Sequence, residues 1–226
     1  MGETSPVTTV VVHGAGSTGA AAGVLLGLDS DAVFVEDRSG DVEQVMASLD
    51  DTIGRHPGCT HLVGISLGAH AVARWASCTT KPVPRLVLVL PAWIGAPAAT
   101  AQATAAAGHS VAAEGITAIL GRLARDGSHP DVVRLLQLSW PEYSDDELSR
   151  CLARASSGRG PTPTELAAIS APMTVVGWRG DAFHPESAVH AWARHLRRPA
   201  VVMAARPEIR LLRQALATDP GGGGGS

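Results

Sequence analysis

Short apolar runs alternate with helical patterns along the first ninety residues. The runs are rich in β-branched residues and cover residues 7–12, 32–35, 61–63 and 85–90. Each is short and bounded by turn residues, which indicates a buried strand. After the second run, Asp41 is a typical N-cap, and the apolar residues that follow it recur at helical spacing. Strands that alternate with helices predict a parallel sheet with right-handed crossovers.

The alternation stops after the fourth strand. Residues 96–167 carry no strand pattern, but two capping boxes begin helices there, Ser144 with Glu147 and Thr162 with Glu165. We therefore expect a helical lid at 96–167, inserted into the sheet domain.

The strand pattern resumes at 173–176, and a helix to residue 196, a strand at 200–204 and a helix from about residue 207 follow. We predict an α/β fold with a mostly parallel, doubly wound sheet formed by residues 1–95 and 168–220. The glycine-rich residues 221–226 are interpreted as a linker or appended tail.

Composition excludes several kinds of partner. The net charge is −3 and the basic residues are scattered, so we expect neither nucleic acid nor a membrane surface as partner. No apolar stretch could span a bilayer, and the polar N-terminus lacks the apolar core of a signal peptide. The widely spaced Cys59, Cys78 and Cys151 match no metal motif, so we expect reduced thiols in a cytoplasmic protein without metal or cofactor. The oligomeric state is not indicated.

The pentapeptide Gly64-Ile65-Ser66-Leu67-Gly68 lies between the third apolar run and a helical stretch at 69–76. Strand, G-x-S-x-G and helix together are typical of a nucleophile elbow, in which a tight turn exposes the serine hydroxyl. The helix N-terminus that follows would direct N–H groups toward an oxyanion. A glycine-tightened turn with an incidental serine fits the same pattern.

Other polar groups follow the predicted strands in the same way. The His13-Gly14 loop, Asp37, Asp181 and His184 each come after a strand. Ligands of open parallel sheets bind at the carboxyl ends of the strands, where these groups would gather with Ser66. The convergence favours a serine hydrolase.

These motifs together resemble the α/β-hydrolase family over nearly the whole chain. His13-Gly14-Ala15-Gly16 is similar to its HG-x loop, Asp37 to Gly40 to its D-x-x-G loop, and Gly180-Asp181 stands where the family usually carries its catalytic acid. The resemblance implies Ser66 as nucleophile, Asp181 as acid and an oxyanion hole formed by the N–H groups of Ala15 and Leu67. Two strands that often precede the first are missing, which implies a compact member.

The histidine departs from the family pattern. The family normally supplies it after the last strand, where this chain reads Ala204-Ala205-Arg206-Pro207. His184 is the candidate base because it lies on the Asp181 loop at the correct edge of the sheet; a helix-entry residue before Pro185 is the equal alternative. His70 is expected in the core or behind the site, and His13 is expected to support its own loop.

The predicted substrate is a small ester, thioester or related acyl compound. Trp93, Trp140 and Trp178 lie near the carboxyl edge and could line an apolar acyl pocket, or could equally be ordinary core residues.

Two other functions stay open. Gly14 to Gly19 forms G-x-G-x-x-G between strand and helix, with Glu36 and Asp37 about twenty residues later, which fits a dinucleotide-binding oxidoreductase. A hydrolase-like scaffold with an incomplete triad, which binds, isomerises or cyclises a small molecule, would explain the missing histidine.

Overall fold

The structure, a computed structural model, describes residues 8–28, 32–181 and 183–204. In these residues one six-stranded, all-parallel sheet has the order β2-β1-β3-β4-β5-β6. The strands are β1 (Thr8–Val12), β2 (Ala32–Val35), β3 (Cys59–Ile65), β4 (Arg85–Val89), β5 (Met173–Trp178) and β6 (Ala200–Ala204). The α/β class and the parallel sheet are confirmed. The expected helix from residue 207 lies outside the described residues.

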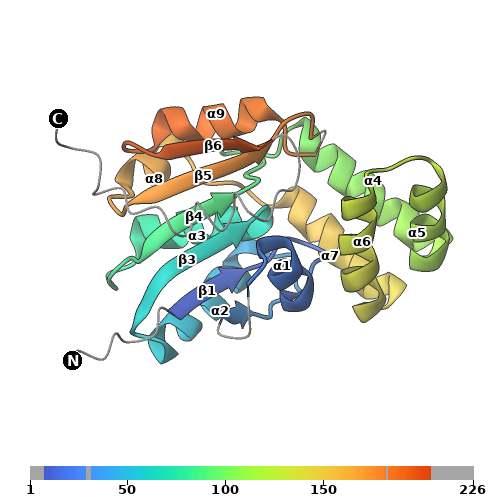
Figure 1. The fold of residues 1–226 in the computed structure, drawn as a ribbon, viewed down its shortest axis with the longest axis horizontal. Coiled ribbons are helices and arrows are strands. Elements are labelled where there is room, and N and C mark those ends of the chain that lie inside the picture. Colours follow the sequence, from blue (N-terminus) through green and yellow to red (C-terminus); the bar gives the residue numbers. More distant parts are fainter. Residues whose placement is uncertain (1–7, 29–31, 182, 205–226) are drawn as a thin grey trace.

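Helices cover both faces of the sheet (Figure 1). Alternate strand residues point to opposite faces, so Val11 and Val63 pack on the side of α1 (Gly19–Leu26). The other face packs against α2 (Val42–Arg55), α3 (Leu67–Cys78), α8 (Pro163–Ala168) and α9 (Glu186–His195). Coverage on both faces explains why the strands are almost continuously apolar.

The helical insertion consists of α4 (Ala99–Glu114), α5 (Ile116–Arg125), α6 (Pro130–Ser139), the 3₁₀ turn η1 (Trp140–Glu142) and α7 (Asp145–Ser157). These helices lie beyond the carboxyl ends of the strands (Figure 1). They share an apolar cluster of their own, which includes Val111, Trp140, Leu148 and Leu152. Both expected capping boxes form, at the start of α7 and of α8. No helix in the described residues is long and apolar enough to cross a membrane.

The two ends of the helical insertion are joined at a short neck. The N–H of Gly95 donates to the carbonyl of Pro161 (2.9 Å), and the N–H of Gly160 donates to the carbonyl of Gly95 (2.8 Å). The indole N–H of Trp93 donates to the Gly158 carbonyl (3.2 Å). The insertion therefore leaves and rejoins the sheet domain at one place.

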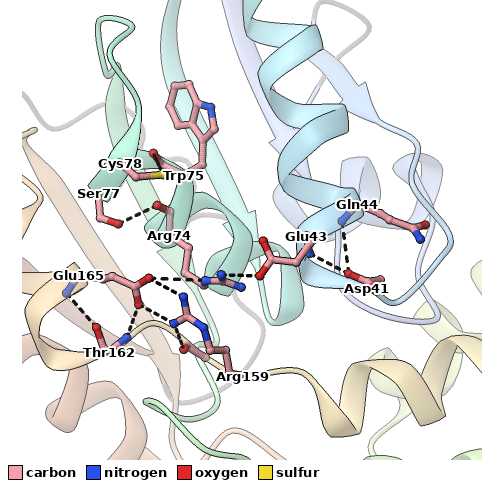
Figure 2. Close-up of polar contacts among 11 residues, drawn as sticks. Asp41, Glu43, Gln44, Arg74, Trp75, Ser77, Cys78, Arg159, Thr162 and Glu165 are labelled. Carbon is pink, nitrogen blue, oxygen red and sulfur yellow. Dashed lines mark hydrogen bonds and ion pairs between the residues drawn. The ribbon is translucent and has the colours of Figure 1, made fainter.

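A buried guanidinium ties three helices together on the α3 face (Figure 2). Arg74 of α3 lies between Glu43 of α2, at 2.5 Å, and Glu165 of α8, at 3.8 Å. Arg159 also binds Glu165 at 2.8 Å, and this hydrogen bond lowers the pKa of Glu165 to about 2. The flanking carboxylates compensate the cost of burying the Arg74 charge.

Candidate active site

Ser66 sits on a strained turn between β3 and α3. Its backbone has φ 54° and ψ −114°, a region that costs a non-glycine residue about 1–3 kcal/mol. A Cβ on Gly64 would lie 2.6 Å from the Gly68 carbonyl oxygen, and one on Gly68 would lie 2.1 Å from the carbonyl oxygen of Val12. Gly64 therefore allows the strand and helix of the elbow to approach each other, and Gly68 allows the start of α3 to pack against the end of β1.

Asp181 and His184 share one loop after β5. Oδ1 of Asp181 accepts the backbone N–H groups of Phe183 (2.8 Å) and His184 (3.0 Å). Its Oδ2 lies 3.2 Å from Nδ1 of His184, and Nε2 of that ring lies 2.9 Å from the Ser66 hydroxyl oxygen. Only β4 separates β3 from β5, so the two loops meet at the carboxyl edge. The structure thus brings together all three residues that the sequence singled out.

The charge of Asp181 determines which imidazole nitrogen is free. Burial alone would raise the pKa of this carboxyl, but the hydrogen bonds and charge of His184 outweigh it and lower the pKa below its usual value. The ionised carboxylate can only accept, so the proton of a neutral imidazole is on Nδ1. Nε2 then carries the lone pair that accepts the Ser66 O–H.

Two backbone N–H groups lie next to Ser66. Ala15 occupies a tight turn in which the Ser17 N–H donates to the Gly14 carbonyl (3.1 Å) and Gly16 has φ 66°. The turn rests on the elbow, because a Cβ on Gly14 would lie 3.2 Å from Ser66 Cβ. Leu67 is the first residue of α3. Within the described residues, neither the Ala15 nor the Leu67 N–H has a hydrogen-bond acceptor, so both are free to bind an oxyanion.

His70 is a core residue. It is 1% exposed, and its Nε2 accepts the N–H groups of Ala92 (3.2 Å) and Trp93 (3.4 Å). Burial, reinforced by the charges of His184 and Arg74, lowers its pKa to about 3, so the ring is neutral. Because Nε2 already accepts two N–H groups and a pKa of about 3 makes the ring a weak base, His70 cannot replace His184 at the nucleophile. His13 supports its own loop, with Nδ1 2.9 Å from the Gly14 carbonyl oxygen.

The three candidate pocket tryptophans are buried in different clusters. Trp93 packs edge-on against His70, with ring centroids 4.8 Å apart. Trp140 belongs to the cluster of the helical insertion, and Trp178 to the cluster on the α1 face of the sheet. Each supports packing in this structure, and contact with an acyl chain stays a prediction.

The glycine-rich loop is not open to a dinucleotide. At the N-terminus of α1, the Thr18 hydroxyl accepts the Ala21 N–H and the Glu36 carboxylate accepts the Gly19 N–H. Asp37 is engaged by Ser39 and by the Ser48 hydroxyl (3.0 Å). The helix terminus and the acid that would hold pyrophosphate and ribose are therefore both occupied by the protein itself.

No group of three histidine, cysteine or carboxylate side chains in the described part of the chain could hold a metal ion. An open cavity of about 590 Å³ lies in the helical insertion, lined by α5, Gln137, Pro141 and residues 143–145. It contains none of Ser66, Asp181 and His184, so we do not assign it to the candidate active site.

Sequence reasoning missed Tyr143, whose hydroxyl donates to the Ser17 carbonyl beside the candidate oxyanion hole (2.7 Å). The one available signal was that a buried tyrosine needs a partner for its hydroxyl. Nothing in the sequence indicates that a residue 126 positions away supplies that partner.

Known structures share this architecture, although no protein-family model and no curated protein sequence matches the chain. The esterase EaEST from Exiguobacterium antarcticum superposes with a TM-score of 0.75 at 10% identity, over 94% of this chain and 91% of that one. MenH from S. aureus gives 0.71 at 12% identity, over 93% and 92%. The enol-lactonase from Burkholderia xenovorans LB400 gives 0.68 at 13% identity, over 96% and 90%. With the strand order, the elbow and the site at the carboxyl edge, these likenesses identify the architecture: the chain has the α/β-hydrolase fold.

Proposed function

We propose that this protein is a serine hydrolase that cleaves an ester, thioester or related acyl compound through an acyl-enzyme intermediate. The observation that carries the proposal is the continuous hydrogen-bonded array of Asp181, His184 and Ser66, with contacts of 3.2 and 2.9 Å. A serine hydroxyl is a weak nucleophile at neutral pH and needs a positioned proton acceptor of this kind.

Each residue has a defined part in acylation. Ser66 Oγ attacks the acyl carbon while its proton passes to Nε2 of His184, and Asp181 holds the Nδ1–H and stabilises the imidazolium. The carbonyl π electrons move onto oxygen, and the N–H groups of Ala15 and Leu67 bind the resulting oxyanion. Collapse breaks the bond to the leaving group, which takes the proton from Nε2.

Deacylation repeats these steps with water as the nucleophile. His184 removes a proton from water while the water oxygen attacks the carbonyl carbon of acyl-Ser66. Collapse of the second tetrahedral intermediate breaks the bond to Ser66 Oγ, which takes the proton back, and releases the carboxylic acid. The same base therefore serves both halves of the cycle.

The alternative scaffold with an incomplete triad was suggested by the missing histidine after the last strand. Nε2 of His184 lies 2.9 Å from the Ser66 hydroxyl oxygen, and this contact supports the serine hydrolase proposal over the alternative. The similar structures include an esterase and an enol-lactonase, which act on different substrates by their names. The substrate of this chain therefore has to be determined by experiment.

The proposal is tested with Ser66→Ala. Turnover of short-chain p-nitrophenyl esters should vanish in this variant, and labelling by a fluorophosphonate probe should vanish with it, because both need an activated serine. The melting temperature should change little, since Ser66 is a half-buried surface residue. Wild-type turnover in Ser66→Ala would refute the proposal.

A further inference from the structure

The turn that carries Ala15 is held between two parts of the molecule. On one side it packs against the elbow, where a Cβ on Gly14 would lie 3.2 Å from Ser66 Cβ. On its other side, a Cβ on Gly16 would lie 3.0 Å from Leu148 Cδ1 and 3.4 Å from Trp140 Nε1, both in the helical insertion. The helical insertion is therefore one of the two surfaces that shape the candidate oxyanion hole.

One side chain makes a specific polar contact across this junction. Tyr143, 6% exposed and directly after η1, donates its hydroxyl to the Ser17 carbonyl at 2.7 Å. Ser17 is also the residue whose N–H closes the turn onto Gly14. Tyr143 thus binds the residue on which the conformation of the turn depends.

The Tyr143 hydroxyl is itself well fixed. The Arg38 guanidinium lies 5.2 Å from the centroid of the Tyr143 ring, within range of a cation–π interaction. Arg38 also donates to the Glu142 carbonyl at 2.7 Å, which anchors η1 to the loop after β2. Burial raises the pKa of Tyr143 above its usual value, so the hydroxyl stays protonated and remains a donor.

We propose that Tyr143 is a positioning residue for the oxyanion hole. Its hydroxyl holds the turn of residues 14–17 so that the Ala15 N–H faces the oxygen that becomes charged during acyl transfer. Loss of one oxyanion donor costs about 10²–10³ in rate, and a donor displaced by a fraction of an ångström loses part of that benefit. The inference rests on the proposed function, because it concerns the same reaction.

Tyr143→Phe isolates the contribution of the hydroxyl. The ring keeps its packing, so the variant should fold. We expect kcat for a p-nitrophenyl ester to fall about tenfold while KM stays within about twofold of wild type, because the oxyanion forms after substrate binding.

A second readout separates positioning from a general loss of structure. A trifluoromethyl ketone analogue adds to Ser66 and forms a tetrahedral oxyanion, so its inhibition constant should rise by the factor by which kcat/KM falls. The matching unreactive amide forms no oxyanion, and its affinity should stay unchanged.

Ser139→Ala is the matched control. Its buried hydroxyl donates to the Leu135 carbonyl at 2.9 Å, within the helical insertion and without touching the turn. Both variants lose one hydroxyl–carbonyl bond and should lose a similar few degrees of melting temperature. Only Tyr143→Phe should lose kcat.

Two results would overturn the positioning role: wild-type kcat and ketone inhibition in Tyr143→Phe, or an equal loss of kcat in Ser139→Ala. Ser66→Ala distinguishes the two levels of the inference. If it abolishes turnover while Tyr143→Phe behaves like wild type, only the positioning role fails. If Ser66→Ala retains turnover, the proposed function fails and the role of Tyr143 fails with it.

Discussion

Acidification should destabilise this protein through His70, four residues beyond the candidate nucleophile. The ring is 1% exposed and uses Nε2 as an acceptor for two backbone N–H groups at the start of the neck. Protonation would replace that lone pair with a donor that faces other donors, in a site without solvent. Burial, reinforced by the charges of His184 and Arg74, lowers its pKa to about 3 in the folded protein, against 6.5 for an ordinary histidine.

The sign of the effect follows from proton binding. Between pH 6.5 and about 3 the unfolded chain holds a proton at position 70 and the folded protein does not. The contribution of His70 to the free energy of unfolding therefore decreases as the pH falls through this range, and it does not vary above it. Each pH unit well inside the range costs about 1.4 kcal/mol, so the loss between pH 7 and pH 5 is about 2 kcal/mol.

Urea unfolding followed by tryptophan fluorescence measures this loss at half-unit pH steps from 5 to 7.5. His70→Gln is the comparison, because the Gln amide oxygen can accept the same N–H groups and does not titrate. Only the pH dependence is compared, so a lower absolute stability of the variant is unimportant. Wild type should lose about 2 kcal/mol more than the variant between pH 7 and pH 5. Parallel curves for the two proteins would refute the assignment of His70 as a buried, neutral acceptor.

Three further variants test the site and its scaffold. Asp181→Asn should reduce kcat on the order of 10⁴-fold, because an amide neither selects the Nδ1–H tautomer nor stabilises an imidazolium; a loss below tenfold would exclude Asp181 as the acid. His184→Ala should cost as much activity as Ser66→Ala, since the triad acts as a unit, and a clearly smaller cost would point to another base. Gly68→Ala places a Cβ 2.1 Å from the Val12 carbonyl oxygen, so it should lower the free energy of unfolding in urea by about 3 kcal/mol or more. Gly58→Ala is the control: nothing lies within 4 Å of its Cβ, so it should change the free energy of unfolding by less than about 0.5 kcal/mol.

Local sequence patterns determined the elements of this fold. The apolar runs that predict strands and the capping boxes that predict helix starts act over two to eight residues, and the strands and both capping boxes appear at the predicted places. The candidate elbow was also visible, because the G-x-S-x-G motif lies within five residues; a Cβ on Gly64 would clash locally with the Gly68 carbonyl, whereas the Gly68 clash is with the distant Val12. Asp181 and His184 could be proposed for the same reason: one short loop holds both, and the carboxylate binds the backbone of its own turn.

The contacts between distant segments depended on tertiary structure. The order β2-β1-β3-β4-β5-β6 places the Asp181 loop one strand away from the elbow, and this spacing determines that Nε2 of His184 reaches Ser66. The same packing buries Trp93 against His70, although the sequence allowed it equally in a substrate pocket.

The hydrogen bond from Tyr143 to Ser17 shows most clearly what the sequence alone could not predict. A tyrosine hydroxyl before a helix cap has no local signal for its partner, because the partner is selected by how α7 packs on the loop after β1. Periodicity and capping reflect interactions between residues that are close in the chain. The turn of residues 14–17 is instead held between the elbow and the helical insertion, and these two surfaces meet only when the chain has folded.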